Sequence, residues 1–238
     1  MPSFEVLLVL GVFGLYCYDS LMLLNFNELI FIRFKKKWSY KFPILSFQLL
    51  RKFLFLPNLL TPNISLFQVF WPSSDQDVNF KEFDIFIKSL IPVQVISVML
   101  LVLMFVCLPI VAFRYGSGIN LLIVFFAIYI LIISILIYLF TQKNNLKLSN
   151  TKFVSIAFES IVCPPFALNI VRKISLNYPI NVDPYIFSKK MFDEPTKRSF
   201  KHRLCIIIKK KMSFFEDDSS RFIELNKYLN QIKSEKEN

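Results

Sequence analysis

Two carboxylates lie inside otherwise apolar segments and are candidates for ion chemistry. Asp19 ends an uncharged run near the N-terminus, and Glu159 is the single charge in 153–171. Ionisable groups at membrane depth are costly and often mark a proton or ion pathway. If both face one cleft at a membrane boundary, they form a proton or cation site. The alternative is structural: Asp19 reaches the interface near Asn25 and Asn27, and Glu159 lies on the polar face of a surface helix.

Cys163 precedes two prolines, which gives it an unusual local backbone. A thiol at a membrane surface can carry a lipid, so Cys163 is a candidate modified thiol. The alternative is an inert, half-buried thiol, because the sequence suggests no histidine or second cysteine to activate it. The four cysteines are far apart and lack the spacing of a zinc site.

The residue types that most enzymes require are scarce. His202 is the single histidine, and it lies in a run of cations. With one histidine, the chain lacks the residues that a histidine zinc site needs and makes a Ser–His–Asp triad improbable. All four glycines lie in or beside apolar segments, so no phosphate-binding loop is expected. We expect no catalytic residue, no metal site and no cofactor, in a protein that is not an enzyme.

The two longest uncharged segments position the rest of the chain. No charge occurs in the 25 residues from Ser89 to Phe113, or in the 28 from Tyr115 to Gln142. Each segment is long enough to cross a ~30 Å hydrocarbon layer as a helix rising ~1.5 Å per residue. The short connection 114–118 is a tight turn. The sequence therefore predicts a transmembrane helical hairpin over 90–141, with Pro109 bending its first helix.

The apolar segment 1–24 predicts a further transmembrane helix. A cleaved signal peptide has a basic start, whereas this segment has no Lys or Arg and carries Glu5. Gly11 and Gly14 would let another helix approach it closely. With three spans, 25–89 and 141–238 lie on one side of the membrane.

The distribution of basic residues predicts which side that is. Of the 28 Lys and Arg, 27 lie in 25–89 and 141–238. Cytoplasmic loops carry an excess of Lys and Arg. We therefore expect a multi-pass protein of the inner (plasma) membrane, with its N-terminus outside and its C-terminus in the cytoplasm.

The predicted cytoplasmic loop domain, 25–89, contains three local patterns. Glu28–Phe34 and Trp38–Phe42 predict a short β-hairpin around Lys35–Lys37. Leu45–Leu56 predicts a helix in the membrane interface, whose Arg51 and Lys52 reach towards the headgroups; the alternative is a buried helix of a small cytoplasmic fold. An amphipathic helix leads into the hairpin, with its apolar face at Phe80, Phe83, Ile87 and Leu90.

The segment 142–175 is apolar but contains Cys163-Pro164-Pro165. Paired prolines prevent a straight helix, and a fourth span would carry the basic tail outside. We expect a bent segment that lies on the membrane or re-enters it, with Arg172 and Lys173 returning it to the surface. A fourth span and a soluble helix pair are the alternatives. The basic tail 176–238 follows and ends in an amphipathic helix, with a partner-helix face at Phe222, Leu225, Leu229 and Ile232.

The sequence thus predicts a mainly α membrane protein with three spans, interfacial amphipathic helices and a basic tail. Anionic inner-leaflet lipid explains the basic clusters without nucleic acid. The expected headgroup contacts are Lys35, Lys36, Lys37, Arg51, Lys52, Arg172 and Lys173. We expect a non-enzymatic accessory or assembly component that binds a protein partner through its last helix. The alternative is a small transporter or lipid-handling protein that uses Asp19 and Glu159.

Overall fold

The fold of the chain is given by a computed structural model. It describes residues 4–25, 27–42, 48–49, 52–70, 80–116, 118–180, 182–215 and 219–234. The chain divides into two compact units. The first unit contains Met1–Leu23, Leu54–Phe67 and Asn79–Tyr178, and the second contains Leu24–Phe53, Gln68–Val78 and Pro179–Asn238. The fold is mainly α with short strands, which confirms the predicted fold class at that level.

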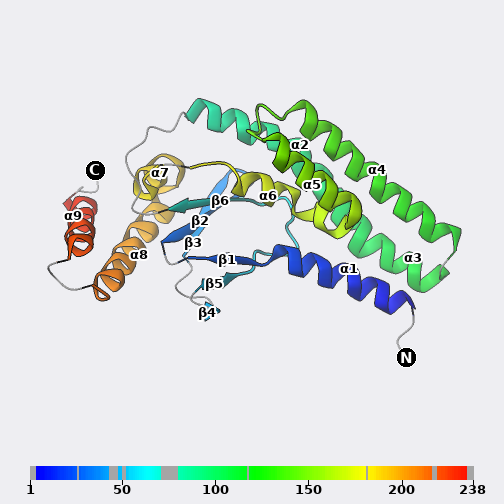
Figure 1. Ribbon diagram of the computed structural model, residues 1–238, viewed down its shortest axis with the longest axis horizontal. Helices are drawn as coiled ribbons and strands as arrows, with labels where there is room; N and C mark the ends of the chain where they lie inside the picture. Colours follow the sequence, from blue (N-terminus) through cyan, green and yellow to red (C-terminus); the bar gives the residue numbers. More distant parts are fainter. Residues whose placement is uncertain are drawn as a thin grey trace. The chain divides into compact units, whose positions relative to one another are not determined.

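The first unit is built on a hairpin of two long helices (Figure 1). One helix runs from α2 (Phe80–Val102) through a π-helical turn, η2 (Leu103–Cys107), into α3 (Leu108–Tyr115). The other is α4 (Ile119–Thr141). By length and composition, these 36-residue and 23-residue helices can each cross a membrane. The hairpin of two long apolar helices is therefore present as predicted.

Two details of the hairpin differ from the sequence-based expectation. The amphipathic lead-in and the first apolar segment form one continuous helix, so Pro92 lies inside α2 and not in a first helical turn. The π-helical turn ends two residues before Pro109, and the Leu108 amide donates to the Leu103 carbonyl. Because proline lacks the amide hydrogen of a regular helix, a wider turn accommodates it.

The ends of the hairpin are closed by different means. At the tight turn, Gly116 follows α3 with φ 66°, a left-handed conformation that glycine adopts without strain. At the open end, the Tyr138 hydroxyl donates to the Ser89 carbonyl (3.0 Å). There Lys147 also pairs with Glu82 (2.7 Å), and that hydrogen bond raises the pKa of Lys147.

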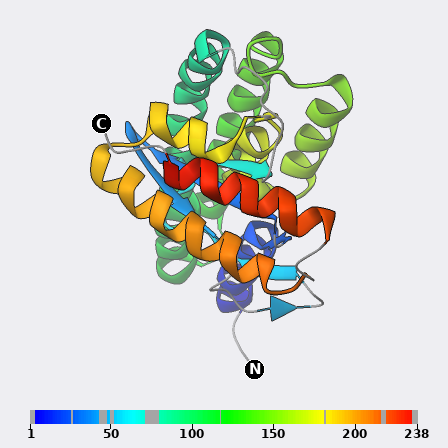
Figure 2. The ribbon, with the colours of Figure 1, turned by 90° about the vertical axis from the view of Figure 1, so that its left-hand side faces the viewer.

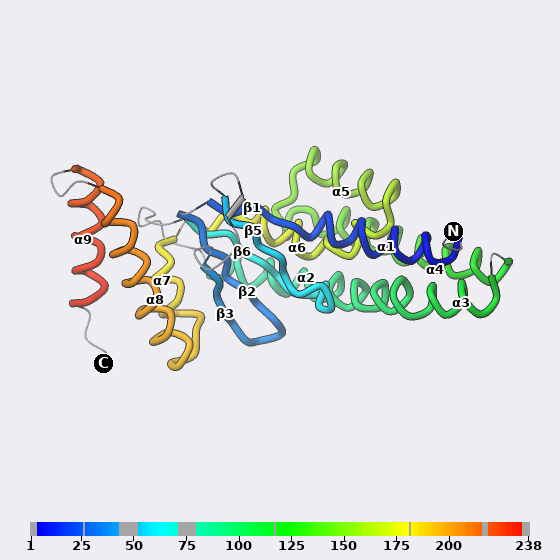
Figure 3. The backbone as a smooth tube through the Cα atoms, turned by 90° about the horizontal axis from the view of Figure 1, so that it is seen from below, coloured from blue at the N-terminus to red at the C-terminus, as the bar shows by residue number. Residues whose placement is uncertain are grey.

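α1 (Phe4–Ser20) runs beside the hairpin. The Phe105 ring lies 6.0 Å from the Phe13 ring and 5.6 Å from the Tyr16 ring. Figures 1 and 3 show that α1 begins at the end of the hairpin that carries the tight turn. α1 has 17 residues, and the structure does not confirm it as a third membrane span.

Three shorter helices complete the first unit. They are α5 (Asn150–Val162), the 3-10 helix η3 (Pro164–Asn169) and α6 (Ile170–Leu176). The Ser149 hydroxyl caps α5 by accepting a hydrogen bond from the Lys152 amide. After α6, the Tyr178 ring packs on Phe86 with their centroids 4.3 Å apart.

The strands of the described residues form two three-stranded sheets, ordered β1-β5-β4 and β3-β2-β6. β2 (Glu28–Phe34) and β3 (Lys37–Lys41) pair antiparallel, which confirms the predicted hairpin. The other strands are β1 (Met22–Leu24), β4 (Gln48–Leu49), β5 (Lys52–Phe55) and β6 (Ser65–Phe70).

The helix predicted over Leu45–Leu56 is wrong for the residues that are described. β4 and β5 pair antiparallel there, with Leu49 opposite Lys52. The physical reason is local: prolines at positions 43 and 57 bracket the segment, and Phe53 and Phe55 alternate with other residues in the two-residue period of a strand. The residues at 43–47, 50 and 51 lie outside the described part.

In the second unit, α7 (Pro184–Met191) and α8 (Glu194–Met212) pack on the β2–β3 hairpin, and α9 (Ser220–Ser234) packs on α8. The Phe31 ring stacks on Phe187 at 4.8 Å and meets Phe192 edge-on at 5.2 Å. Figure 2 shows α8 in orange and α9 in red lying side by side. The terminal helix predicted from the sequence is thus present.

Candidate functional site

α5 runs back along one half of α4. At the start of α5, the Phe153 ring lies 5.7 Å from Phe140 near the end of α4. At the end of α5, the Tyr129 hydroxyl donates to the Ile161 carbonyl (3.3 Å). Tyr129 lies in the middle of α4, so α5 ends at the midpoint of the longer helix. The Cys163-Pro164-Pro165 turn begins at that level.

The paired prolines turn the chain back at this point. The Cys163 amide donates the last α5 hydrogen bond, to the Glu159 carbonyl. Pro164 and Pro165 have no amide hydrogen to continue the helix, and η3 and α6 follow. The bend predicted from the sequence is therefore present. It brings α6 back beside α5, where Lys173 of α6 reaches Glu159 of α5.

Lys173 bridges the two carboxylates singled out in the sequence. Its ammonium nitrogen lies 2.8 Å from Asp19 Oδ1 and 2.7 Å from Glu159 Oε2. The Ser155 hydroxyl donates to the other Glu159 oxygen (2.8 Å). The structure therefore brings Asp19 and Glu159 together at the same cation. Lys173 was expected at lipid headgroups and is instead the centre of this ion pair.

Arg172, the neighbour of Lys173, is buried at 3% exposure. Its guanidinium donates through Nη2 to the carbonyls of Asn58 (2.6 Å) and Thr61 (3.1 Å), and through Nη1 to Asn169 Oδ1 (2.8 Å). Arg172 Nε has no hydrogen-bond partner in the part of the chain that the structure describes. The expected headgroup contact thus lies inside the first unit, where it fixes the segment before β6.

An amide and a hydroxyl connect Arg172 to Asp19. Asn169 Nδ2 donates to Asp19 Oδ2 (2.9 Å) and to Ser20 Oγ (3.0 Å). Arg172 Nη1 also lies 3.3 Å from Ser20 Oγ. Asp19, Glu159, Arg172 and Lys173 form a connected group, called the charge cluster below. Its formal charge sums to zero, so each buried or partly buried ion has an opposite charge to compensate it.

Sequence reasoning missed Ser20 and Asn169. Both are buried and polar, and a hydrogen-bond partner is expected for any such group. Asn169 is the single amide side chain in 153–171, a signal that could have marked it. The choice of partner could not be read from the sequence, because it depends on how α1 meets η3.

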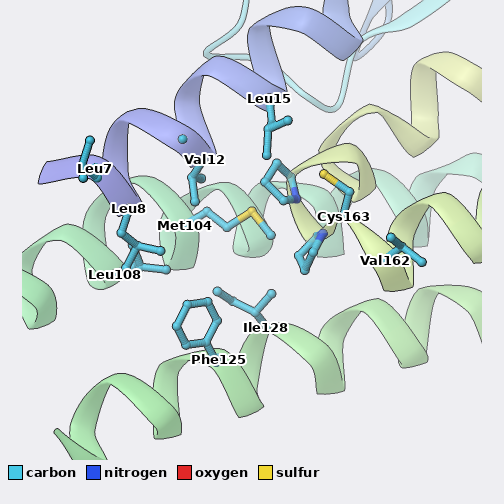
Figure 4. A pocket seen from close by; sticks show the side chains of 13 residues that line it. Leu7, Leu8, Val12, Leu15, Met104, Leu108, Phe125, Ile128, Val162 and Cys163 are labelled. Carbon is cyan, nitrogen blue, oxygen red and sulfur yellow. The ribbon is translucent and has the colours of Figure 1, made fainter. Parts of the chain in front are cut away.

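An apolar cavity of about 320 Å³ lies between α1, the π-helical turn, α4 and the Cys163-Pro164-Pro165 turn (Figure 4). Its walls are the α1 face from Leu7 to Leu15, Met104 and Leu108 at the π-helical turn, and Phe125 and Ile128 of α4. Val162 to Pro165 close one end. The Cys163 thiol and Met104 thioether are the only heteroatom-bearing side chains among the described lining residues. The lining is therefore suited to hydrocarbon, and its described residues carry no charge.

The remaining predicted site residues lie elsewhere. Lys35, Lys36, Lys37 and Lys52 are exposed on β-strands or their turn, and Arg51 lies outside the described residues. On α9, Leu225, Leu229 and Ile232 are buried, and α9 packs against α8. Phe222 is half-buried. The face predicted to receive a partner helix is thus covered by the chain's own α8.

Comparison with known proteins gave no match: no family model, curated protein or solved structure is detectably similar to this chain. The candidate site therefore stands on its own geometry.

Proposed function

We propose that the chain is an integral protein of the inner membrane, spanning it with α1, α2–α3 and α4. The N-terminus lies outside and the C-terminus in the cytoplasm. Two helices with the length and composition of membrane spans support this topology, as does the charge distribution. The outward side of α4 supports lipid contact, because large apolar residues are exposed along its length: Ile119, Leu122, Phe126, Ile133, Ile137 and Phe140.

In this topology, α5, η3 and α6 form a re-entrant segment. The contacts of α5 with Phe140 and Tyr129 support entry to about half the depth of α4. Val154, Phe158 and Ile161 are exposed on α5 and suit contact with lipid. The zero formal charge of the cluster also favours this depth, because uncompensated ions are expensive there.

Within that framework, the chain is a non-enzymatic lipid-handling protein. The observation that carries this function is the cavity of about 320 Å³, whose described wall residues are apolar and uncharged. Ligand pockets have volumes of about 300–1,000 Å³ and mainly apolar linings. The cavity opens among helices whose outer faces are themselves apolar, so bilayer lipid is the molecule with direct access to it.

The geometry favours this function over an accessory or assembly role. The assembly role relied on the apolar face of α9 as a docking surface. That face is buried, and α8 occupies the neighbouring position. Asp19 and Glu159, on which the alternative relied, come together at Lys173 and hold α1, α5 and α6 around one end of the cavity.

Native mass spectrometry of the protein released from detergent micelles tests the function. We expect a retained lipid on the unmodified chain and its loss in Gly11→Phe. A side chain at Gly11 projects into open space, and Gly11 lines the cavity. Gly14→Phe is the matched control, because Gly14 has equal space on the same helix but does not line the cavity.

Retention of lipid by Gly14→Phe together with loss in Gly11→Phe supports the function. Absence of retained lipid on the unmodified protein, or equal retention in both variants, contradicts it. A reporter fused to the C-terminus tests the topology separately. Activity of that reporter on the outer side would reverse the proposed orientation.

A further inference from the structure

We infer that the cavity holds a single acyl chain of a membrane lipid from the leaflet at the tight turn, with its methyl end at Cys163. This inference rests on the proposed function and specifies the ligand, its leaflet and its direction. Four observations support it separately: the depth of the cavity in the hairpin, the direction in which the cavity runs, the chemistry of its lining and its volume.

The depth of the cavity is fixed by α4. Tyr129, in the middle of α4, bonds to the Ile161 carbonyl, and the cavity closes two to four residues further on, at Cys163–Pro165. Its α4 wall consists of Phe125 and Ile128, which lie between that midpoint and the turn. The cavity therefore occupies one half of the hairpin, the half that ends at Gly116.

The direction of the cavity is fixed by α1. Figure 4 shows Leu7 and Leu8 at one end and Leu15 towards Cys163 at the other. Because α1 begins beside the tight turn (Figures 1 and 3), its first residues mark the end nearest that membrane surface. The interval from Leu7 to Leu15 spans roughly 12 Å of helix at ~1.5 Å per residue. This is close to the ~15 Å depth of one hydrocarbon leaflet.

The chemistry of the lining selects the acyl chain over a headgroup. No charged residue occurs among the described residues that line the cavity, so their electrostatic complement is an uncharged, non-hydrogen-bonding chain. A headgroup placed at Cys163 would be buried against proline rings and apolar side chains. A headgroup beyond Leu7 would instead reach the membrane surface, so the ester end lies towards the turn.

The size of the cavity also fits a chain. Its volume of about 320 Å³ is roughly twice that of an apolar cavity of ~150 Å³ that holds benzene. A linear hydrocarbon segment longer than one ring therefore fits. Met104 can adjust to its contour, because methionine is unbranched and has three rotatable side-chain bonds.

Photo-crosslinking in reconstituted vesicles tests the position of the chain. Two phosphatidylcholine probes are used, with a diazirine either at the methyl end or next to the ester of one acyl chain. We expect the methyl-end probe to mark the peptide with Cys163–Pro165, and the ester-end probe to mark Leu7 or Leu8. Gly11→Phe should reduce the cavity adducts about tenfold, equivalent to ~1.4 kcal/mol, while Gly14→Phe leaves them unchanged.

The leaflet is tested by adding the methyl-end probe to only one side of sealed vesicles of known protein orientation. Adducts at Cys163–Pro165 should form only from the leaflet at the tight turn. The inference is overturned if the methyl-end probe marks Leu7 or Leu8 and the ester-end probe marks Cys163–Pro165, or if adducts form from the opposite leaflet. Retention of lipid in native mass spectrometry would still support the proposed function in that case. Loss of both retention and cavity adducts removes the two proposals together. Adducts at Cys163–Pro165 that persist in Gly11→Phe show general lipid contact and also overturn the inference.

Discussion

Asp19 and Glu159 share one cation: Lys173 Nζ lies 2.8 Å from the first carboxylate and 2.7 Å from the second. Asp19 is at the end of α1 and Glu159 is in α5, so the lysine joins segments that are distant in sequence. Both carboxylates therefore have a structural role in the resting protein. A proton or cation pathway through them would first have to displace the Lys173 ammonium.

Replacing Lys173 with methionine should lower the free energy of unfolding by about 1–3 kcal/mol, because it leaves two carboxylates without their cation. The upper limit is modest because the Glu159 side chain is 38% exposed and so only partly buried by protein, and because Ser155 and Asn169 still donate hydrogen bonds to the two carboxylates. The measurement is reversible unfolding in mixed micelles. Lys88→Met is the control: its pair with Asp84 is an exposed i,i+4 contact, and its loss should cost at most about 0.5 kcal/mol.

Charge balance gives a second test of the same cluster. Combining Lys173→Met with Asp19→Asn and Glu159→Gln removes the unpaired carboxylates, and should recover part of the lost stability. If the triple variant is less stable than Lys173→Met alone, the charges are not the main source of the effect.

Arg172→Lys should lower the free energy of unfolding of the first unit by about 2–4 kcal/mol. A lysine ammonium cannot reproduce the planar guanidinium, whose N–H groups donate to several acceptors at once. The lost contacts are those to the Asn58 and Thr61 carbonyls. Limited proteolysis between residues 56 and 64 should therefore accelerate. Arg114→Lys, at the tight turn, is the comparison and should leave this cleavage rate unchanged. Equal cleavage of the two variants would contradict a clamping role for Arg172.

The proposed re-entrant segment predicts protection from aqueous thiol reagents. Val162 is 64% exposed on the protein surface, so any shielding of Val162→Cys must come from lipid. In permeabilised membranes, with the native cysteines replaced by serine, a charged maleimide should label Asn144→Cys rapidly and Val162→Cys slowly. Detergent should raise the Val162→Cys rate. Equal rates before detergent would place the end of α5 in water.

The contact between α8 and α9 predicts unequal effects from two apolar residues on one helix. Leu229 is buried at 4% exposure, while Ile223 is 60% exposed. Leu229→Ala should weaken the docking of α9 by about 2–4 kcal/mol, whereas Ile223→Ala should change it by less than about 0.5 kcal/mol. Hydrogen exchange of the α9 amides measures the difference. Equal exchange in the two variants would mean that α9 does not dock through this face.

Cys205 on α8 offers a test by pH. Burial raises the pKa of its thiol, although nearby lysines act in the opposite direction. Near pH 8–9 the folded protein therefore holds less thiolate at Cys205 than the unfolded chain does. The free energy of unfolding should fall as the pH rises above about 8.5, the pKa of a cysteine thiol in the unfolded chain. With the other cysteines changed to serine, alkylation at pH 8 should be slower in the folded protein than in denaturant.

The sequence was most informative where one local pattern decides the structure. The uncharged runs predict the hairpin of α2–α3 and α4, and the Lys35–Lys37 break predicts the turn between β2 and β3. It failed over Leu45–Leu56, where aromatic residues at alternating positions pair as strands although the segment also suits a helix.

The site was harder to predict than the fold. Asp19 and Glu159 are visible as anomalies in apolar segments, but the cation that joins them is not. Lys173 follows Arg172 in a pattern typical of a surface basic pair, and it turns inward because η3 aligns α6 with the end of α1. The cavity is also invisible in the sequence, since its leucines and valines resemble those of any apolar helix.

The pairing of Asp19 with Lys173 has a consequence for synthesis. The carboxylate emerges from the ribosome 154 residues before its cation, which is about 8–30 s at typical elongation rates of 5–20 residues per second. During that interval α1 carries an uncompensated charge at its end and cannot complete its contacts with η3. The contacts of α1 with η3 and Lys173 can therefore form only after the Pro-Pro turn and α6 have been synthesised.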